Sequence, residues 1–359
     1  MTLGNHPTIV YMDEPPGPGP SSLIRYDVTT ASRAEILKTE ITEAHVSPDG
    51  QWIAIATVFS KTPVLQLVRT DGQNAQTVFC GETDGRIRGI LWSQDQKSMI
   101  FSAGSGSGSP PIYRLDLSAG TLQTELLNNS LSTDYVPLSW LDGNRLLVVG
   151  RPVGPGPGYD LRILDLSQGL NQQASALQVV VNTSAECFDA GNDGTTVYTS
   201  QCNGAFSDMG GGTLRGPSTI SAQSAPGGQK RVVFTSPTLA VTQIRAVGSN
   251  QLLLIVGNQD PANSSAASMN GLWKVKTDGS GLTRLAPSAG KQAQFAAYSQ
   301  APGATVSLDA SLYAFQLYAL LAKPPSYSLV VGAIAGGQTT TFASRADGGL
   351  LLIIGWSST

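Results

Sequence analysis

The chain has 359 residues, of which 40 are Gly and 21 are Pro, and only 13% are charged. A long helical protein would carry more charged residues on its faces, and a disordered chain would combine high net charge with few apolar residues, so the composition excludes both classes. The formal net charge of -3, without any run of Lys or Arg, also argues against nucleic acid or an anionic membrane as a partner. A large all-β protein rich in turns fits these numbers.

The first expected elements are three short strands, over residues 8–12, 23–27 and 34–37. They read as the second, third and fourth strands of a four-stranded unit. A strand over residues 350–356, at the other end of the chain, would supply the innermost strand. Both termini would then complete one blade, which removes free sheet edges.

From residue 44 onward, a turn followed by an apolar strand recurs, and its copies start near residues 44, 86, 136, 185, 241 and 293. The turns are built around Asp or Asn, which favour tight hairpins, and they centre on Asp49, Asp95, Asp142, Asp193 and Asn250, with a further copy at Asp347. Third and fourth strands are expected over residues 64–68 and 77–79, 112–116 and 122–125, and 272–275 and 282–285. Four short strands per unit, repeated roughly every 42 to 56 residues, predict the blades of a β-propeller.

We therefore predict an all-β fold with a single domain, a seven-bladed β-propeller of four-stranded blades over residues 1–359. Strands within residues 8–38 would be completed by the strand over 350–356. Six or eight blades are the alternatives, because residues 288–349 are the least regular part of the pattern.

Two motifs resemble those of a known family. The Ser-Pro-Asp-Gly turn at residues 47–50 and the phrase Thr-Asp-Gly-Ser-Gly-Leu-Thr-Arg-Leu at residues 277–285 resemble the repeats of TolB-like β-propellers. The resemblance covers nearly the whole chain and implies a propeller of the kind found in periplasmic and secreted proteins. Its Asp residues make turns, so it points to a fold and says almost nothing about activity.

The connections from second to third strands are long and rich in Gly and Pro, whereas the first-to-second turns are tight. Long loops are usually functional or disordered, so we predict a binding surface on the long-loop face. Aromatic and Arg side chains among small residues suit recognition of a protein or a saccharide. The candidate residues are Arg88, Tyr135, Arg151, Tyr159, Phe206, Asp208, Met209, Arg245 and Asp260.

Few enzyme classes fit the chain. His6 and His45 are the only histidines, so the metal-binding His cluster of the propellers that resemble pectate-type lyases cannot be built. A Gly-x-Ser-x-Gly hydrolase motif is absent as well. We predict no metal and no other cofactor, although the Asp- and Asn-rich loops would suit Ca²⁺; no EF-hand-like spacing supports such a site.

Three cysteines are present, at Cys80, Cys187 and Cys202. Cys187 and Cys202 flank the turn at residues 193–194 symmetrically and would face each other on adjacent strands, so a disulfide is predicted. A disulfide favours an oxidising compartment. Cys80 is left over, and the sequence assigns it no role.

The amino-terminal residues 1–7 lack the charged and apolar regions of a signal peptide. No stretch approaches the roughly 18 apolar residues of a membrane helix, so this chain is not expected to insert into a membrane. Such a chain is either cytosolic or the mature or excised portion of a longer protein, and the low charge and the cysteines favour the second.

The leading hypothesis is a non-catalytic, extracytoplasmic propeller, in the periplasm, secreted or at the cell surface, that binds a protein or glycan. It would serve as the sensor or scaffold part of a larger envelope protein. One alternative is a structural subunit that self-associates through low-charge surfaces into a surface layer or filament. Another is a lyase or hydrolase centred on the channel, with Asp134, Tyr135 or Arg88 as its acid-base groups.

Overall fold

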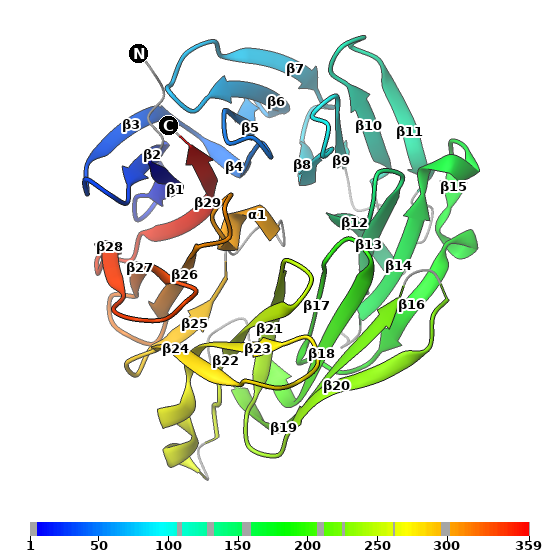
Figure 1. The fold of residues 1–359 in the computed structure, drawn as a ribbon. Coiled ribbons are helices and arrows are strands. Elements are labelled where there is room, and N and C mark those ends of the chain that lie inside the picture. The colour runs from blue at the N-terminus through cyan, green and yellow to red at the C-terminus, as the bar shows by residue number, and fades with distance from the viewer. Residues whose placement is uncertain are drawn as a thin grey trace. The chain divides into compact units, whose positions relative to one another are not determined.

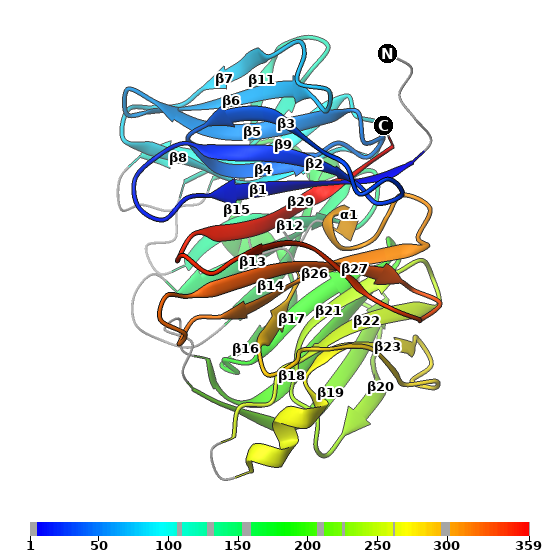
Figure 2. The ribbon, with the colours of Figure 1, turned by 90° about the vertical axis from the view of Figure 1, so that its left-hand side faces the viewer.

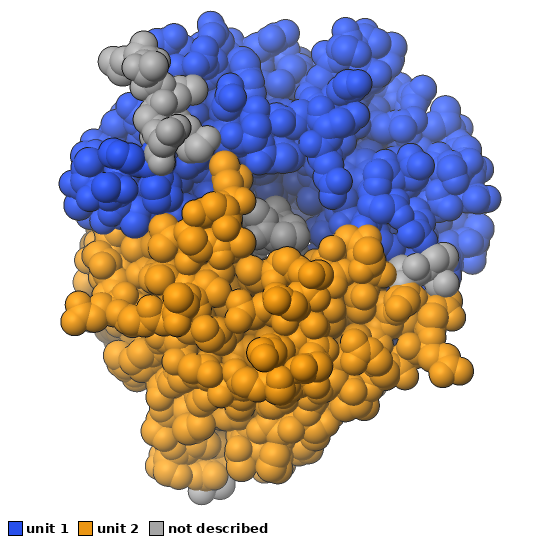
Figure 3. All heavy atoms as spheres, viewed as in Figure 1, with its two compact units in different colours: residues 1–183, 298–304, 354–359 blue, residues 184–297, 305–353 orange. Residues whose placement is uncertain are grey.

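The structure is a computed structural model that describes residues 6–105, 110–127, 133–152, 159–206, 212–224, 227–260, 263–295 and 302–358. Its chain divides into two compact units, which Figure 3 colours separately. Unit 1 comprises residues 1–183, 298–304 and 354–359, and unit 2 comprises residues 184–297 and 305–353. The expectation of a single domain over residues 1–359 stays a prediction.

The fold is an all-β, seven-bladed propeller, as predicted (Figure 1). One blade joins both ends of the chain in the strand order β29-β1-β2-β3, so the predicted closure by terminal strands is confirmed. Its strands are β29 (Leu350–Ser358), β1 (Pro7–Glu14), β2 (Ser21–Asp27) and β3 (Arg33–Thr39).

Three further blades belong to unit 1, and Figure 2 shows several of their strands from a second side. The first contains β4 (Ile41–Val46), β5 (Trp52–Phe59), β6 (Thr62–Arg69) and β7 (Gln76–Cys80). The second contains β8 (Gly85–Trp92), β9 (Ser98–Ser105), β10 (Ile112–Asp116) and β11 (Leu122–Leu127), with β15 (Gln172–Gln173) added parallel to β11. The third contains β12 (Thr133–Trp140), β13 (Arg145–Pro152), β14 (Tyr159–Asp165) and β16 (Gln178–Thr183). The 3-10 helices η1 (Leu166–Gln168) and η2 (Ala174–Ala176) flank β15.

Unit 2 holds three blades. They contain β17 (Phe188–Asn192), β18 (Thr196–Phe206), β19 (Gly212–Ser224) and β20 (Lys230–Ser236); β21 (Val241–Val247), β22 (Gln251–Val256), β23 (Gly271–Lys276) and β24 (Thr283–Pro287); and β25 (Gln292–Gln294), β26 (Leu312–Ala319), β27 (Ser326–Ala333) and β28 (Thr340–Arg345). The short helix η3 (Ser264–Met269) lies in unit 2, whereas residues 302–304 of the short helix α1 (Pro302–Thr305) are assigned to unit 1. Among the described residues, no helix is both long and apolar enough to cross a membrane.

The repeated Asp residues build the turns. In the first-to-second turn of the β4–β5 hairpin, Ser47 Oγ donates to Asp49 Oδ1 (2.6 Å), Gln51 N donates to the same oxygen (3.1 Å) and Trp52 N donates to Ser47 Oγ (2.9 Å). The same arrangement recurs at Ser93–Asp95 and at Ser307–Asp309. These carboxylates accept hydrogen bonds from the Ser hydroxyl and the backbone N–H groups of their own turns. Their role is therefore structural.

The last blade differs from the sequence prediction in two details. The Asp347 turn joins the fourth strand β28 to the innermost strand β29, so it is not a first-to-second hairpin as the pattern suggested. The true first-to-second turn of this blade is the one at Ser307–Asp309. It was missed because β25 is only three residues long and a segment containing α1 separates it from the turn.

One irregularity recurs in all seven blades. The pairing of the third with the fourth strand skips one residue of the fourth strand, which is a β-bulge. The skipped residues are Ile36, Val78, Glu125, Val180, Val233, Leu285 and Phe342. Six of them are apolar, as expected for positions that pack between blades, and Glu125 is the exception.

Candidate functional site

The β18–β19 hairpin is the longest pair of strands among the described residues, with 11 and 13 residues. Its outer part, residues 203–206 paired with 212–215, is here named the arm. The long connections predicted between second and third strands include residues 203–216, but the described part of this segment continues the two strands. The arm therefore has a defined backbone that can present side chains.

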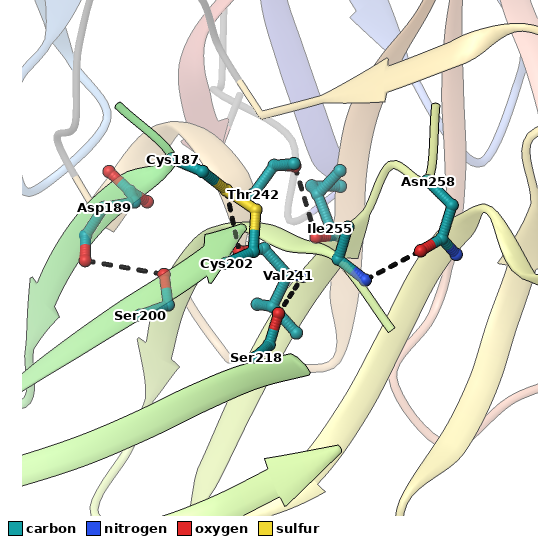
Figure 4. Close-up of a disulfide and its surroundings, with 10 residues drawn as sticks. Cys187, Asp189, Ser200, Cys202, Ser218, Val241, Thr242, Ile255 and Asn258 are labelled. Atoms are coloured by element: carbon teal, nitrogen blue, oxygen red, sulfur yellow. Dashed lines mark hydrogen bonds between the residues drawn. A yellow bond between two sulfur atoms is a disulfide. The ribbon is translucent and has the colours of Figure 1, made fainter. Parts of the chain in front are cut away.

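The base of the arm is joined to β17 by the predicted disulfide (Figure 4). Cys187 and Cys202 have Cα atoms 5.2 Å apart, and Cys202 N donates to Cys187 O (3.1 Å). Both cysteines are buried, at 4% and 6% exposure, in an apolar cluster with Leu214 of the arm and Ala240. The disulfide thus fixes the position at which the arm leaves the sheet.

The neighbouring blade carries a second elaborated connection, residues 258–270 between β22 and β23, here named the insertion. Asn258 and Asn270 close it by bonding reciprocally: Asn258 N donates to Asn270 Oδ1 (2.7 Å), and Asn270 Nδ2 donates to Asn258 O (2.9 Å). Both side chains are buried, and Asn258 Nδ2 also donates to Ala266 O at 3.1 Å. The described part of the insertion, including η3, projects from the strands of its blade (Figures 1 and 2).

A β-bridge joins the arm to the insertion. Leu214 N donates to Gln259 O (2.8 Å), and Gln259 N donates to Leu214 O (2.7 Å). The surface that results is mainly polar, and among its described residues Arg215 and Asp260 are charged. Its exposed members include Asn203 and Arg215 on the arm and Asn263, Ser265, Ser268 and Met269 on the insertion.

Arg245, one of the predicted binding residues, forms a buried ion pair. Its Nη1 donates to Asp189 Oδ2 (2.8 Å), and its guanidinium lies 5.1 Å from the centroid of the Phe295 ring. Asp189 also accepts from Ile244 N (2.8 Å), so the pair joins the innermost strands of two blades. Burial raises the pKa of Asp189, while Arg245 opposes that rise. At 3% exposure, Arg245 offers almost no surface to a ligand.

In unit 1, polar side chains likewise link innermost strands. Arg88 Nη2 donates to Asp134 Oδ2 (2.8 Å), and Arg88 keeps 40% of its side chain exposed. Glu43 accepts from Gly89 N (3.1 Å) and Ile90 N (2.9 Å), at a bulge of β8, and its Oε1 lies 2.7 Å from His45 Nε2. His45 is therefore a packed residue at 3% exposure.

The Tyr135 side chain on β12 is buried and bonds to residues of its own blade. Its hydroxyl donates to Asp160 Oδ2, which also accepts from Arg162 Nε (2.9 Å), and the Arg162 guanidinium lies 5.5 Å from the Tyr135 ring centroid. Burial and the bond to Asp160 raise the pKa of Tyr135 to about 12. The Tyr135 hydroxyl therefore acts as a buried hydrogen-bond donor that stabilises the fold.

The remaining predicted site residues are placed less completely. Arg151 and Phe206 lie on β13 and at the end of β18, and Tyr159 begins β14. Asp260 follows the bridge residue Gln259 in the insertion. Asp208 and Met209 lie outside the described residues. The arm, which contains Phe206, and the insertion, which contains Asp260, are thus joined by a β-bridge. The other three predicted residues lie in separate side-chain contacts, those of Arg88, Tyr135 and Arg245.

Sequence reasoning missed Gln259, Asn258 and Asn270, which hold the two connections together. The only signal was an Asn at each end of the long connection. Among the residues that the structure describes, no group of three or more His, Cys, Asp or Glu side chains is placed to hold a metal ion. The arrangement is suited to recognition by hydrogen bonds and shape.

Known proteins show similarity at the level of structure. No protein-family model matches the chain, and no curated protein matches it. The β-propeller domain of the Trilobed protease from Pyrococcus furiosus has a TM-score of 0.57 at 10% identity, over 97% of this chain and 94% of that domain. The Pyrococcus horikoshii acylaminoacyl peptidase has a TM-score of 0.60 at 12% identity, over 97% of this chain and 52% of that chain.

Structural neighbours also include TolB from Acinetobacter baumannii, with a TM-score of 0.46 at 15% identity, over 77% of this chain and 62% of that one. That match is too loose to carry an argument. At these identities the other matches show the propeller fold alone. The chain spans about half of the peptidase and less than two thirds of TolB.

Proposed function

We propose that this chain is a non-catalytic β-propeller that binds a protein or glycan partner through its long-loop face, with the arm and the insertion as the contact surface. The β-bridge between Leu214 and Gln259 carries this proposal. It turns two long connections of neighbouring blades into one continuous surface, and a preorganised surface loses less conformational entropy when a partner binds. The mainly polar side chains of that surface suit hydrogen-bonded recognition.

The proposal places the protein outside the cytoplasm. The buried disulfide between Cys187 and Cys202 supports this location, because such bonds form and persist in oxidising compartments. The TolB-like repeat motifs point the same way. We also propose that the protein is the sensor or scaffold part of a larger envelope protein. The similarity to the acylaminoacyl peptidase, of which the matched propeller is about half, supports a propeller within a longer chain.

A matched pair of double variants tests the contact surface. N203E/S268E adds two negative charges to the arm and the insertion, and S249E/L308E adds the same charge to exposed first-to-second turns of unit 2. The probe is a purified cell-envelope fraction from the producing organism, and co-sedimentation measures binding. We expect N203E/S268E to lose at least tenfold in bound protein while S249E/L308E binds like wild type. Equal binding by all three proteins would reject the proposed surface.

Sedimentation velocity of the isolated wild-type protein distinguishes the alternative of self-assembly. A partner-binding propeller remains at one sedimentation coefficient as its concentration rises. A structural subunit of a layer or filament forms larger species that N203E/S268E or S249E/L308E would disrupt, and that outcome would replace the proposed function.

A further inference from the structure

Glu125 occupies a position that is apolar in every other blade. It is the residue skipped in the pairing of β10 with β11, where Ile112 pairs with Leu126 and Tyr113 pairs with Thr124. The equivalent bulge residues of the other six blades are Ile, Val, Leu or Phe. Glu125 is 0% exposed, so a carboxyl group has replaced a packed hydrocarbon side chain.

This carboxyl group has one charged neighbour. Arg114 Nε lies 2.8 Å from Glu125 Oε1, and the Arg114 side chain is 34% exposed. Among the described residues, neither carboxyl oxygen of Glu125 has a partner with hydrogen-bond geometry. Burial raises the pKa of Glu125, and the Arg114 charge only partly opposes that rise. A buried ion pair with unmet hydrogen bonds is a weak source of stability.

The segment that pairs with the edge of β11 next to Glu125 comes from the next blade. Residues 166–177, here named the strap, contain η1, β15 and η2 and lie along β11 (Figure 1). Asn171 N donates to Thr124 O (2.9 Å), and β15 pairs Gln172 with Leu126. The strap therefore bonds to the residue on each side of Glu125 and runs beside it along the edge of β11.

Apolar packing and a side-chain hydrogen bond also hold the strap in place. Ala174 and Leu177 pack in an apolar cluster with Leu126, and Arg162 Nη1 donates to Ala174 O (2.6 Å). The strap itself contains no titratable side chain. The charged groups of the adjoining blade, Asp160 and Arg162, are paired with each other. Arg162 and Asp165 also contact the strap, and Asp165 accepts from Ser167 N (2.9 Å) and Ser167 Oγ (2.6 Å). Because the hydrogen bond from the Ser167 hydroxyl lowers the pKa of Asp165, that carboxyl is already ionised in the range above about pH 4.3 in which Glu125 loses its proton.

We propose that Glu125 and the strap form a proton-sensitive latch on the outer edge of the β8–β11 blade. The strap stays docked on β11 while the Glu125 carboxyl is protonated, and it is loosened when that carboxyl ionises. Undocking lets water reach the carboxylate, which offsets the cost of its charge. It also uncovers the β11 edge, whose unpaired N–H and C=O groups can accept another strand.

The sign of the pH dependence follows from linkage. Because the docked state raises the pKa of Glu125, docking is strongest below the pKa of an exposed Glu, about 4.3. Above that pH the opening constant rises about tenfold per pH unit, and it levels off once the pH passes the raised pKa of the docked state. A pH above the raised pKa of Glu125 therefore favours the open strap.

Amide hydrogen exchange, followed by mass spectrometry on peptides covering residues 166–177, measures this opening. The variants are E125Q, which cannot ionise, E125V, which restores the apolar bulge residue of the other blades, and E40Q, which removes an exposed carboxyl in the same unit. Rates are corrected for intrinsic exchange, and a β5 peptide reports global unfolding. We expect wild type and E40Q to show the same pH-dependent loss of protection in the strap, and E125Q and E125V to show none.

Two outcomes would overturn the latch. One is a strap whose corrected protection is independent of pH in wild type. The other is an E125Q profile that follows wild type. Should E125V fail to fold, E125Q alone decides between these outcomes, because it preserves the shape of the side chain.

Discussion

The hydroxyl of Tyr135 on β12 donates a hydrogen bond to the carboxylate of Asp160 on β14, across the intervening strand β13. The strand between them carries Gly150, whose register partners are Tyr135 on one side and Asp160 on the other. A Cβ atom at Gly150 would lie 2.7 Å from Tyr135 Cε1 and 2.4 Å from Thr133 Cγ2. The glycine therefore makes room for the aromatic ring to reach its partner.

Gly150→Ala should consequently destabilise the protein by about 1–3 kcal/mol, because the methyl group displaces the Tyr135 ring. Gly143→Ala is the matched control, since a Cβ atom there meets nothing within 4 Å. It should change stability by only a few tenths of a kcal/mol. Urea denaturation of both variants measures the difference, and equal midpoints would refute the role given to Gly150.

The same tyrosine supplies a pH prediction. Burial and hydrogen bonding hold the pKa of Tyr135 at about 12, and burial does the same for Tyr313 and Tyr318. Their neutral forms stabilise the fold below a pH of about 10, the usual pKa of Tyr, and this contribution is lost as the pH rises toward 12. Ultraviolet titration of tyrosinate should show a late-ionising group in the folded protein. Tyr135→Phe should lower its amplitude by one residue, and an unchanged amplitude would contradict this assignment.

The sequence was most informative where the structure is local. Asp49 and its Ser47 partner define a turn through bonds within six residues, so the hairpins, and from them the blades, were predictable. The disulfide was predictable for the same reason, because Cys187 and Cys202 lie symmetrically about one turn.

The sequence was least informative where partners come from different blades. Nothing near Arg245 indicates that Asp189 neutralises it, and nothing near Leu214 points to Gln259. Such pairs depend on how one blade is placed against the next, which local patterns do not encode. The long-loop face could therefore be predicted as a region, whereas the joining of the arm to the insertion could not.

Removal of the disulfide should weaken the base of the arm. The bond closes a 15-residue separation, for which the chain-entropy model gives about 3 kcal/mol. C187A/C202A should lose about that free energy of unfolding, and the amides of the arm should exchange faster. C80S removes the exposed free cysteine and should leave both quantities unchanged. A C187A/C202A protein as stable as C80S would show that the bond does not stabilise this region.

The Asp189–Arg245 pair should behave as a buried charge pair. Arg245→Met leaves the Asp189 carboxylate without its guanidinium and should cost about 3–5 kcal/mol. The double variant D189N/R245M keeps an acceptor for Ile244 N and leaves no unpaired charge, so it should recover at least half of the loss. A double-mutant cycle by chemical denaturation measures this coupling. Additive losses would mean that the two side chains do not stabilise each other.

The most direct test of the binding surface is site-specific photo-crosslinking in the cells that produce the protein. A photoreactive residue replaces Arg215 on the arm or Ala267 on the insertion, and control positions are Gln94 and Ser249 on first-to-second turns, all four being exposed. We expect a crosslinked product of one defined mass from Arg215 and Ala267 and little or none from Gln94 and Ser249. Equal yields at all four positions, or products only at the controls, would contradict this expectation.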